Sequence, residues 1–119
     1  MTRSKRLFLF ATSALLFVLA GCRAHMITIK LVNTSAQPIS TIIVDYPSAT
    51  FGKDQLAPGE TFSSPVKITE AGPLKAQFVD ATGARHTYTL PGLRPNDEGS
   101  IEVSLNQTGA SAVTHLAGR

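Results

Sequence analysis

Apolar and polar side chains alternate through most of the chain after residue 25. In the first such stretch, residues 25–33, Ile27, Ile29 and Leu31 face one way, and Thr28 and Lys30 face the other. A period of two residues predicts a β-strand with one buried face. The same alternation predicts strands over 39–46, 61–69, 74–79, 85–90 and 100–106, with a short strand around 50–51.

Turn signals separate these segments at the spacing that is usual for sandwiches and small barrels. They lie at 33–38, 56–60 and 80–83, and a long polar loop follows at 91–99. Pro65 cannot donate a ladder hydrogen bond, which predicts that its strand is an edge strand or a bulged one. The expected fold is all-β: a single antiparallel β-sandwich of about seven strands over residues 25–106.

This strand pattern resembles, at the level of architecture, an immunoglobulin-like or fibronectin-like sandwich. The cysteine pair and the tryptophan of true immunoglobulin domains are missing, because the chain has one cysteine and no tryptophan. Residues 107–119 carry little apolar surface, so we expect a flexible C-terminal tail there. Val113 and Leu116 are the two residues of that tail that could dock on the domain.

The N-terminus has a different character from the rest of the chain. Arg3, Lys5 and Arg6 come first, and an apolar run of about 13 residues follows over 7–19. That length fits the core of a signal peptide and is shorter than the roughly 17–25 residues of a membrane-spanning helix. Ala20 and Gly21 then supply small residues before Cys22.

Leu19-Ala20-Gly21-Cys22 resembles the lipobox of bacterial lipoproteins. The resemblance implies cleavage between Gly21 and Cys22, which makes 1–21 a signal peptide and 22–24 the lipidated terminus and tether. It also implies a diacylglyceryl group on the Cys22 thiol and acylation, such as palmitoylation, of the new amine. Two or more acyl chains hold a protein stably at a membrane. Arg23 is not the aspartate that retains lipoproteins in the inner membrane, which implies the outer membrane if the source is Gram-negative.

Two other interpretations of the N-terminus stay open at this point. One is an uncleaved membrane anchor, which the shortness of the apolar run disfavours. The other is an ordinary secretory signal cut after Ala24, which the poor small-x-small site formed by Cys22, Arg23 and Ala24 disfavours.

Charge argues against nucleic-acid binding. Three of the 11 Lys and Arg residues precede Cys22, so eight remain in the mature chain. The mature chain also has eight Asp and Glu residues. Nucleic-acid binding needs clustered cations, whereas these charges are balanced and scattered. A single cysteine excludes an intramolecular disulfide in the mature domain.

Residues that could carry chemistry are few and dispersed. His25, His86 and His115 lack a metal-ligand spacing, and we expect His86 to be partly buried with a backbone partner. Asp97 and Glu98 are adjacent in the expected loop and point apart, so they do not form a carboxylate pair for acid–base work. The segment 96–99 lacks the acidic residues at alternate positions of a calcium loop, which favours a plain turn. The sequence therefore predicts no catalytic residue, no metal site and no cofactor.

Two Asn-x-Ser/Thr triplets, at Asn33 and Asn106, match a glycosylation pattern that we interpret as coincidence, with the first forming a turn. The function expected from these observations is non-enzymatic: a lipid-anchored protein of the cell envelope that binds another protein or helps an assembly. The alternative is a module that binds cell-wall glycan. Glycan binding needs exposed aromatic rings, and most of the aromatic residues fall at expected core positions.

Overall fold

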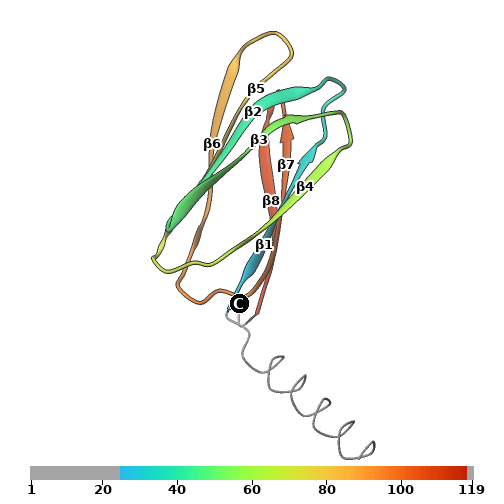
Figure 1. Ribbon diagram of the computed structural model, residues 1–119. Helices are drawn as coiled ribbons and strands as arrows, with labels where there is room; N and C mark the ends of the chain where they lie inside the picture. The colour runs from blue at the N-terminus through green and yellow to red at the C-terminus, as the bar shows by residue number, and fades with distance from the viewer. Residues whose placement is uncertain (1–24, 118–119) are drawn as a thin grey trace, which may run out of the picture.

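The computed structural model describes residues 25–117 and confirms the all-β sandwich (Figure 1). Eight strands form two four-stranded sheets that pack face to face. The strands are β1 (Ile27–Asn33), β2 (Ile39–Tyr46), β3 (Ala49–Leu56), β4 (Thr61–Val66), β5 (Gly72–Val79), β6 (Arg85–Leu93), β7 (Gly99–Asn106) and β8 (Gly109–Leu116).

The two sheets have the strand orders β4-β1-β7-β8 and β3-β2-β5-β6. Neighbouring strands are antiparallel except β1 and β7, which are parallel. The expectation of a purely antiparallel sheet was therefore wrong, because the first strand and the seventh come together only after the chain has crossed between the sheets. In a constant-type immunoglobulin domain the first two strands are neighbours in one sheet. Here β1 and β2 lie in different sheets.

The core lies between the two sheets and is built from the inward face of each strand. The residues that alternate in the sequence are the buried ones, which is the expected consequence of the two-residue period. The central strands contribute most of them: Ile27, Ile29 and Leu31 from β1, Ile42 and Val44 from β2, Leu74, Ala76 and Phe78 from β5, and Ile101, Val103 and Leu105 from β7.

A bulge in β2 keeps its apolar side chains in this core. Ile39 and Ile42 are both buried although they are three residues apart, and the register with β5 shifts between Ser40 and Ile43. Thr41, inside the shift, has a φ of 51°. An extra residue in one strand is what a bulge supplies, and it restores the inward alternation after the break.

The C-terminal segment differs most from expectation. Residues 109–116 form β8, which pairs with β7 from Gly99–Leu116 to Asn106–Gly109, so the prediction of a flexible tail was wrong there. The strand forms because β7 offers it a complete antiparallel ladder and because Ala110, Ala112 and Leu116 pack against the core. The sandwich therefore continues past residue 106 and has eight strands rather than seven.

β6 and β3 are also longer than expected, whereas the strand that contains Pro65 lies at a sheet edge as expected. β6 continues to Leu93, three residues into the segment 91–99 that we assigned to a loop, and β3 covers 49–56 rather than a short stretch. Leu93 is buried, which explains the continuation. Pro65 lies in β4, an edge strand, as its missing N–H requires.

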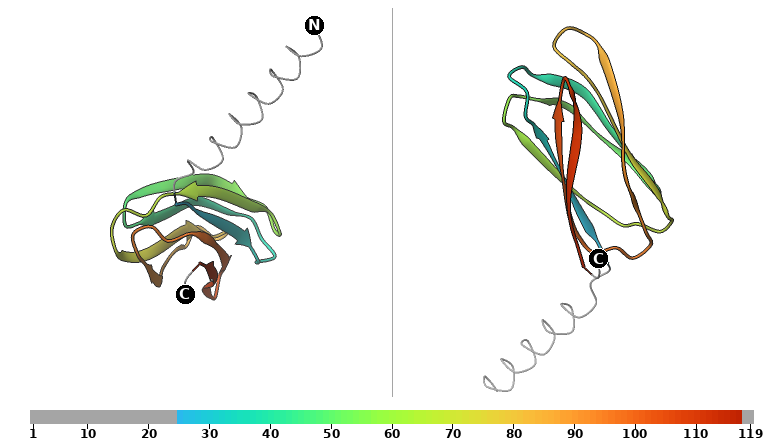
Figure 2. Two further views of the ribbon diagram at one scale, coloured as in Figure 1. Left: turned by 90° about the horizontal axis from the view of Figure 1, so that it is seen from below. Right: turned by 180° about the vertical axis from the view of Figure 1, so that it is seen from behind.

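The connections divide between the two ends of the sandwich (Figures 1 and 2). The β1–β2, β3–β4, β5–β6 and β7–β8 turns lie together at one end, which we call the four-turn end (residues 34–38, 57–60, 80–84 and 107–108). The described chain begins at the opposite end, where β1 starts. The β5–β6 hairpin, gold in Figure 1, extends farthest at the four-turn end. Within residues 25–117 no helix is long and apolar enough to cross a membrane.

Candidate functional site

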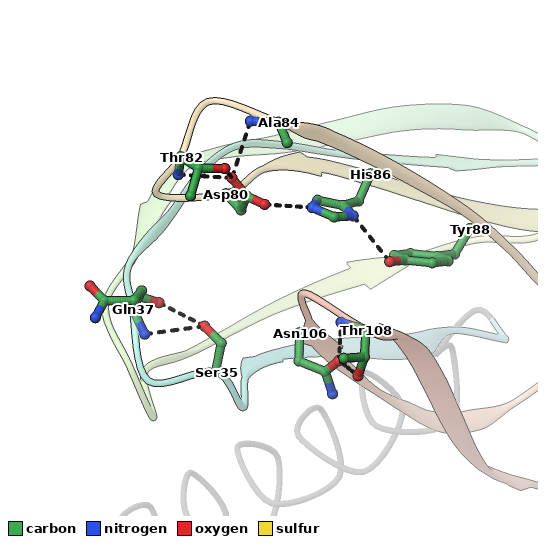
Figure 3. Close-up of polar contacts among 9 residues, drawn as sticks. All are labelled: Ser35, Gln37, Asp80, Thr82, Ala84, His86, Tyr88, Asn106 and Thr108. Carbon is green, nitrogen blue, oxygen red and sulfur yellow. Dashed lines mark hydrogen bonds and ion pairs between the residues drawn. The ribbon is translucent and has the colours of Figure 1, made fainter.

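Three turns of the four-turn end use one hydrogen-bonding pattern, and Figure 3 shows it for Asp80 with Thr82 and for Asn106 with Thr108. In each, an Asn or Asp side-chain oxygen accepts hydrogen bonds from the main-chain N–H and the hydroxyl of the Ser or Thr two residues later. Such side chains mimic a backbone turn and fix the path of the chain. The pairs, with the N–H and hydroxyl distances in that order, are Asn33 with Ser35 (3.0 and 2.6 Å), Asp80 with Thr82 (2.8 and 2.6 Å) and Asn106 with Thr108 (2.9 and 2.7 Å).

This pattern explains both glycosylation-like triplets as turn motifs. Asn33 is 0% exposed, and its amide nitrogen donates to the carbonyl oxygens of Gln37 (2.8 Å) and Leu56 (3.0 Å). Its main-chain N–H donates to Glu60, and its carbonyl accepts from Gly59. Asn33 therefore ties the β1–β2 turn to the β3–β4 turn, and its side-chain amide is fully engaged inside the protein.

The Asp80 side chain makes four hydrogen bonds, as many as the side chain of Asn33. Its Oδ1 atom also accepts the main-chain N–H of Ala84 at 3.1 Å, in addition to the two donors of Thr82. Its Oδ2 atom lies 2.7 Å from Nε2 of His86. The pairing of β5 with β6 places Phe78 directly opposite His86, so Asp80 and His86 are diagonal neighbours on the inward face of the hairpin.

His86 continues this polar chain to Tyr88. The Tyr88 hydroxyl lies 3.3 Å from Nδ1 of His86, and the two rings are nearly parallel, with an interplanar angle of 14°. Phe78, the cross-strand partner of His86, stacks on the imidazole, with the two ring centroids 5.1 Å apart. The His86 side chain is 21% exposed and that of Asp80 is 6% exposed, so the imidazole is more accessible to solvent than the carboxylate.

Hydrogen bonding controls the charge of Asp80. The Thr82 hydroxyl contributes most and His86 comes next, and with the turn N–H groups they hold the pKa of the Asp80 carboxyl well below its usual range, against the opposing effect of burial. Asp80 is therefore a carboxylate at neutral pH. With a neutral imidazole, Nε2–H of His86 donates to Asp80, and Nδ1 accepts from the Tyr88 hydroxyl.

The hydrogen bonds of this arrangement fix the three side chains relative to one another. In the catalytic triads of hydrolases, the nitrogen opposite the carboxylate faces a serine or cysteine. In residues 25–117 that nitrogen of His86 faces the phenol of Tyr88. The Asp80–His86–Tyr88 chain, which we call the polar relay, runs from the β5–β6 turn along β6 and holds the imidazole between a carboxylate and a phenol.

The other residues singled out in the sequence are spread over the molecule. His86 is partly buried as predicted, but the backbone partner predicted for it was wrong, because its ring binds the Asp80 carboxylate. His25 pairs with Glu98 at the opposite end, and His115 is an exposed residue of β8. Asp97 is buried and accepts the main-chain N–H of Arg94 at 2.8 Å, whereas Glu98 is exposed.

Sequence reasoning missed Asp80 because it assigned the residue only to a turn. The available signal was its spacing. An Asp that begins a short hairpin turn and a His six residues later lie diagonally across the two strands.

The predicted lipidation and cleavage residues, Cys22 and Gly21, lie outside the described residues. The described part of the chain, 25–117, contains no group of three or more His, Cys, Asp or Glu side chains that could hold a metal ion.

Comparison with known proteins extends the description of the fold alone. No protein-family model matches the chain, and no curated protein matches it. The chain is similar in structure to a protein from Eubacterium rectale that was solved by NMR, with a TM-score of 0.59 and 13% sequence identity over 76% of this chain and 91% of that one. Identity this low indicates a shared architecture and carries no information about function.

Proposed function

We propose that this protein is a lipid-anchored component of the bacterial cell envelope that binds another envelope protein through the four-turn end. The anchor part of the proposal comes from the sequence, where a basic start, a short apolar run and Leu19-Ala20-Gly21-Cys22 follow one another in order. Lipid on Cys22 attaches the chain at the end where β1 begins, because only Arg23 and Ala24 separate Cys22 from the described chain. The four-turn end then lies away from the lipid.

The observation that carries the interaction role is the rigidity of this end. Loops that are fixed by their own hydrogen bonds lose little conformational entropy when they bind, which favours recognition. Here three turns are closed by side-chain hydrogen bonds, and the polar relay holds His86 and Tyr88 in place beside them. Gln37, Thr82 and Thr108 are exposed among these turns. They offer uncharged hydrogen-bonding groups of the kind found at protein–protein interfaces.

Site-specific cross-linking in intact cells tests this proposal. A photoreactive residue is placed at Gln37 or Ala81, which are exposed at the four-turn end, and a matched one at Glu70, which is exposed at the opposite end. We expect one discrete protein adduct from the first two positions and none from Glu70. The same adduct from all three positions, or none from any, would remove the four-turn end from consideration as the binding site.

The anchor has a separate test. The protein purified from membranes should have the intact mass of residues 22–119 plus acyl chains, and a Cys22→Ser variant should lose that added mass. An unlipidated mass or a full-length chain would contradict the anchor while leaving the interaction proposal open. If the source is Gram-negative, Arg23 supports the outer membrane as the location, and fractionation on a density gradient would place it.

The alternatives to protein binding receive less support. A glycan site needs aromatic rings that stand free for stacking. In the described chain, Tyr46, Phe51, Phe62 and Tyr88 are half-buried and packed against the core, and Phe78 is buried. Immunoglobulin-like domains serve commonly as cell-surface binding modules. This chain is like them in having two packed sheets with turns at the two ends, and we propose no closer relationship.

A further inference from the structure

The four edge strands of the two sheets differ in whether they carry residues that block pairing with another strand. Exposed strand edges attract other strands, and proteins usually block them with charged residues or proline. β3 carries Lys53 and Asp54, β4 carries Pro65, and β6 carries Arg85 and Pro91. β8 is eight residues long, Gly-Ala-Ser-Ala-Val-Thr-His-Leu, and has neither a proline nor an Asp, Glu, Lys or Arg residue.

The ladder between β7 and β8 shows which main-chain groups of β8 point outward. One step beyond the last pair of the register, the N–H of Ala117 donates to the carbonyl of Glu98 at 2.8 Å. Hydrogen-bonded and non-bonded pairs alternate along an antiparallel ladder. The bonded residues of β8 are therefore 109, 111, 113 and 115. The N–H and C=O groups of Ala110, Ala112, Thr114 and Leu116 point away from β7, and in residues 25–117 β8 has no other paired neighbour.

We propose that this outer edge of β8 pairs antiparallel with β8 of a second copy of the chain, about a twofold axis at Val113. Only this register uses all four outward-facing residues. It sets Ala110 against Leu116 of the second copy and Ala112 against Thr114 of the second copy, and each pair exchanges two hydrogen bonds. A shift of the centre to 112 or 114 leaves an end residue of the strand without a partner. The sheets of the two copies then become one continuous sheet.

The side chains of β8 are self-complementary in that register. Val113 is 57% exposed and would face its own copy, which buries an apolar side chain that the single chain leaves in water. Small residues face larger ones, because Ser111 meets His115 of the second copy and Ala110 meets Leu116 of the second copy. The nearest carboxylate is Glu102, beside Val113 in β7. The two Glu102 residues would lie roughly 14 Å apart, three strand spacings, which exceeds the screening length of about 8 Å in physiological salt.

This pairing has a consequence for an anchored protein. The antiparallel arrangement places the His25 ends of the two chains at opposite ends of the pair, so both lipids reach one bilayer when the long axes lie along the membrane. The inference goes beyond the proposed function and does not depend on it, because β8 is separate from the polar relay and from the turns that carry that proposal.

Disulfide cross-linking of the full chain, purified from membranes in detergent, tests the register. Val113 would be a non-bonded pair with its own copy, where Cα atoms are about 4.5 Å apart, inside the range for a disulfide. We expect the Val113→Cys variant to form a disulfide dimer under mild oxidation. Ser111→Cys is the matched control, because two copies of that residue would lie roughly 13 Å apart along the strands. A mixture of Ser111→Cys and His115→Cys should cross-link again. The unsubstituted chain gives the background from Cys22.

Sedimentation gives the second measurement. The unsubstituted protein should sediment as a dimer, and Val113→Lys should sediment as a monomer with the same far-ultraviolet circular dichroism, because two opposed lysines repel while the exposed site leaves the fold intact. The proposal is overturned if Val113→Cys cross-links no faster than Ser111→Cys, or if the unsubstituted chain is a monomer. Exclusive coupling of the Val113→Cys variant to a different protein would overturn it as well.

Discussion

Oδ2 of Asp80 lies 2.7 Å from Nε2 of His86. The other oxygen of the same carboxylate accepts the hydrogen bonds of Thr82 and Ala84 that close the β5–β6 turn. One carboxylate therefore both shapes the hairpin and orients the imidazole that faces Tyr88. The histidine is positioned by the turn itself, and the geometry of the polar relay depends on the charge of Asp80.

The first prediction concerns acid stability. Because the pKa of Asp80 is lowered in the folded protein from its usual value of 3.8, the folded state binds fewer protons than the unfolded state in acid. Its charge-dependent stabilisation is complete above roughly pH 4 and is lost progressively as the pH falls below that value. Asp80→Asn should therefore lower the melting temperature at pH 7, and the difference from the unsubstituted protein should shrink towards pH 2.

Thermal unfolding from pH 7 to pH 2 checks this, with Asp54→Asn as the control because Asp54 is exposed. The control should track the unsubstituted protein at every pH. An Asp80→Asn deficit that stays constant across the whole range would show that the carboxylate acts by shape and hydrogen bonding, without a charge-dependent part.

The second prediction compares two turn asparagines. Asn33→Asp keeps the oxygen that accepts from Ser35 but replaces an amide that donates to two carbonyl oxygens, at 2.8 and 3.0 Å, with a second acceptor. We expect a loss of roughly 2–4 kcal/mol in the free energy of unfolding, because the buried acceptors lose their donor and face a charge. Asn106→Asp keeps the oxygen that closes its turn and loses only an exposed donor contact of 3.4 Å to the Thr34 hydroxyl, so it should change the free energy of unfolding by less than about 0.5 kcal/mol.

Urea unfolding of both variants provides the measurement. Equal losses at Asn33 and Asn106 would mean that the amide donors of Asn33 contribute little and that the two turns are energetically equivalent.

The third prediction concerns the attachment of β8. Gly99 has a φ of 129°, and a Cβ atom there would lie 2.0 Å from the carbonyl oxygen of His115. Gly99→Ala should cost about 3 kcal/mol and should loosen the end of β8 nearest Leu116, because backbone has no room to yield. Amide hydrogen exchange should show faster exchange in 113–117 than in β1.

Gly109→Ala is the matched control for this strand. A Cβ atom at Gly109 meets nothing within 4 Å. This variant should leave exchange in β8 unchanged. Normal protection of β8 in Gly99→Ala would show that the β6–β7 loop can move away from His115.

The fourth prediction concerns the bulge in β2. Thr41, a β-branched residue, holds a left-handed φ of 51°, which costs roughly 1–2 kcal/mol. Glycine relieves that strain but gives up about 0.5–1 kcal/mol in chain entropy. Thr41→Gly should therefore raise the free energy of unfolding by about 0.5–1 kcal/mol, whereas Thr87→Gly, at an exposed site in β6, should lower it by a similar amount. Chemical denaturation distinguishes the two, and a loss in both variants would argue against strain at Thr41.

Several features of the fold followed directly from the order of residues. Alternation placed Ile27, Ile29 and Leu31 in the core, and Pro65 marked an edge strand. These predictions succeed because a strand turns successive side chains to opposite faces whatever its neighbours are, and because proline lacks a donor in every context. Asn33 predicted a turn for an equally local reason, because its side chain accepts a hydrogen bond from Ser35, two residues later.

Other features depended on residues distant in the chain. The segment 109–116 has mostly small side chains and weak alternation, and it becomes a strand because β7 supplies the ladder. The parallel contact of β1 with β7 joins segments about 70 residues apart, which no local pattern records. Asp80 and His86 each had a plain local interpretation, and only the hairpin register brought the carboxylate to the imidazole. The sequence by itself determined which faces are buried and where the chain turns, because these follow from the chemistry of near neighbours. Tertiary structure decided which strand lies beside which, and with it the polar relay and the unpaired edge of β8. The reason is that pairing depends on main-chain groups that every residue except proline carries alike.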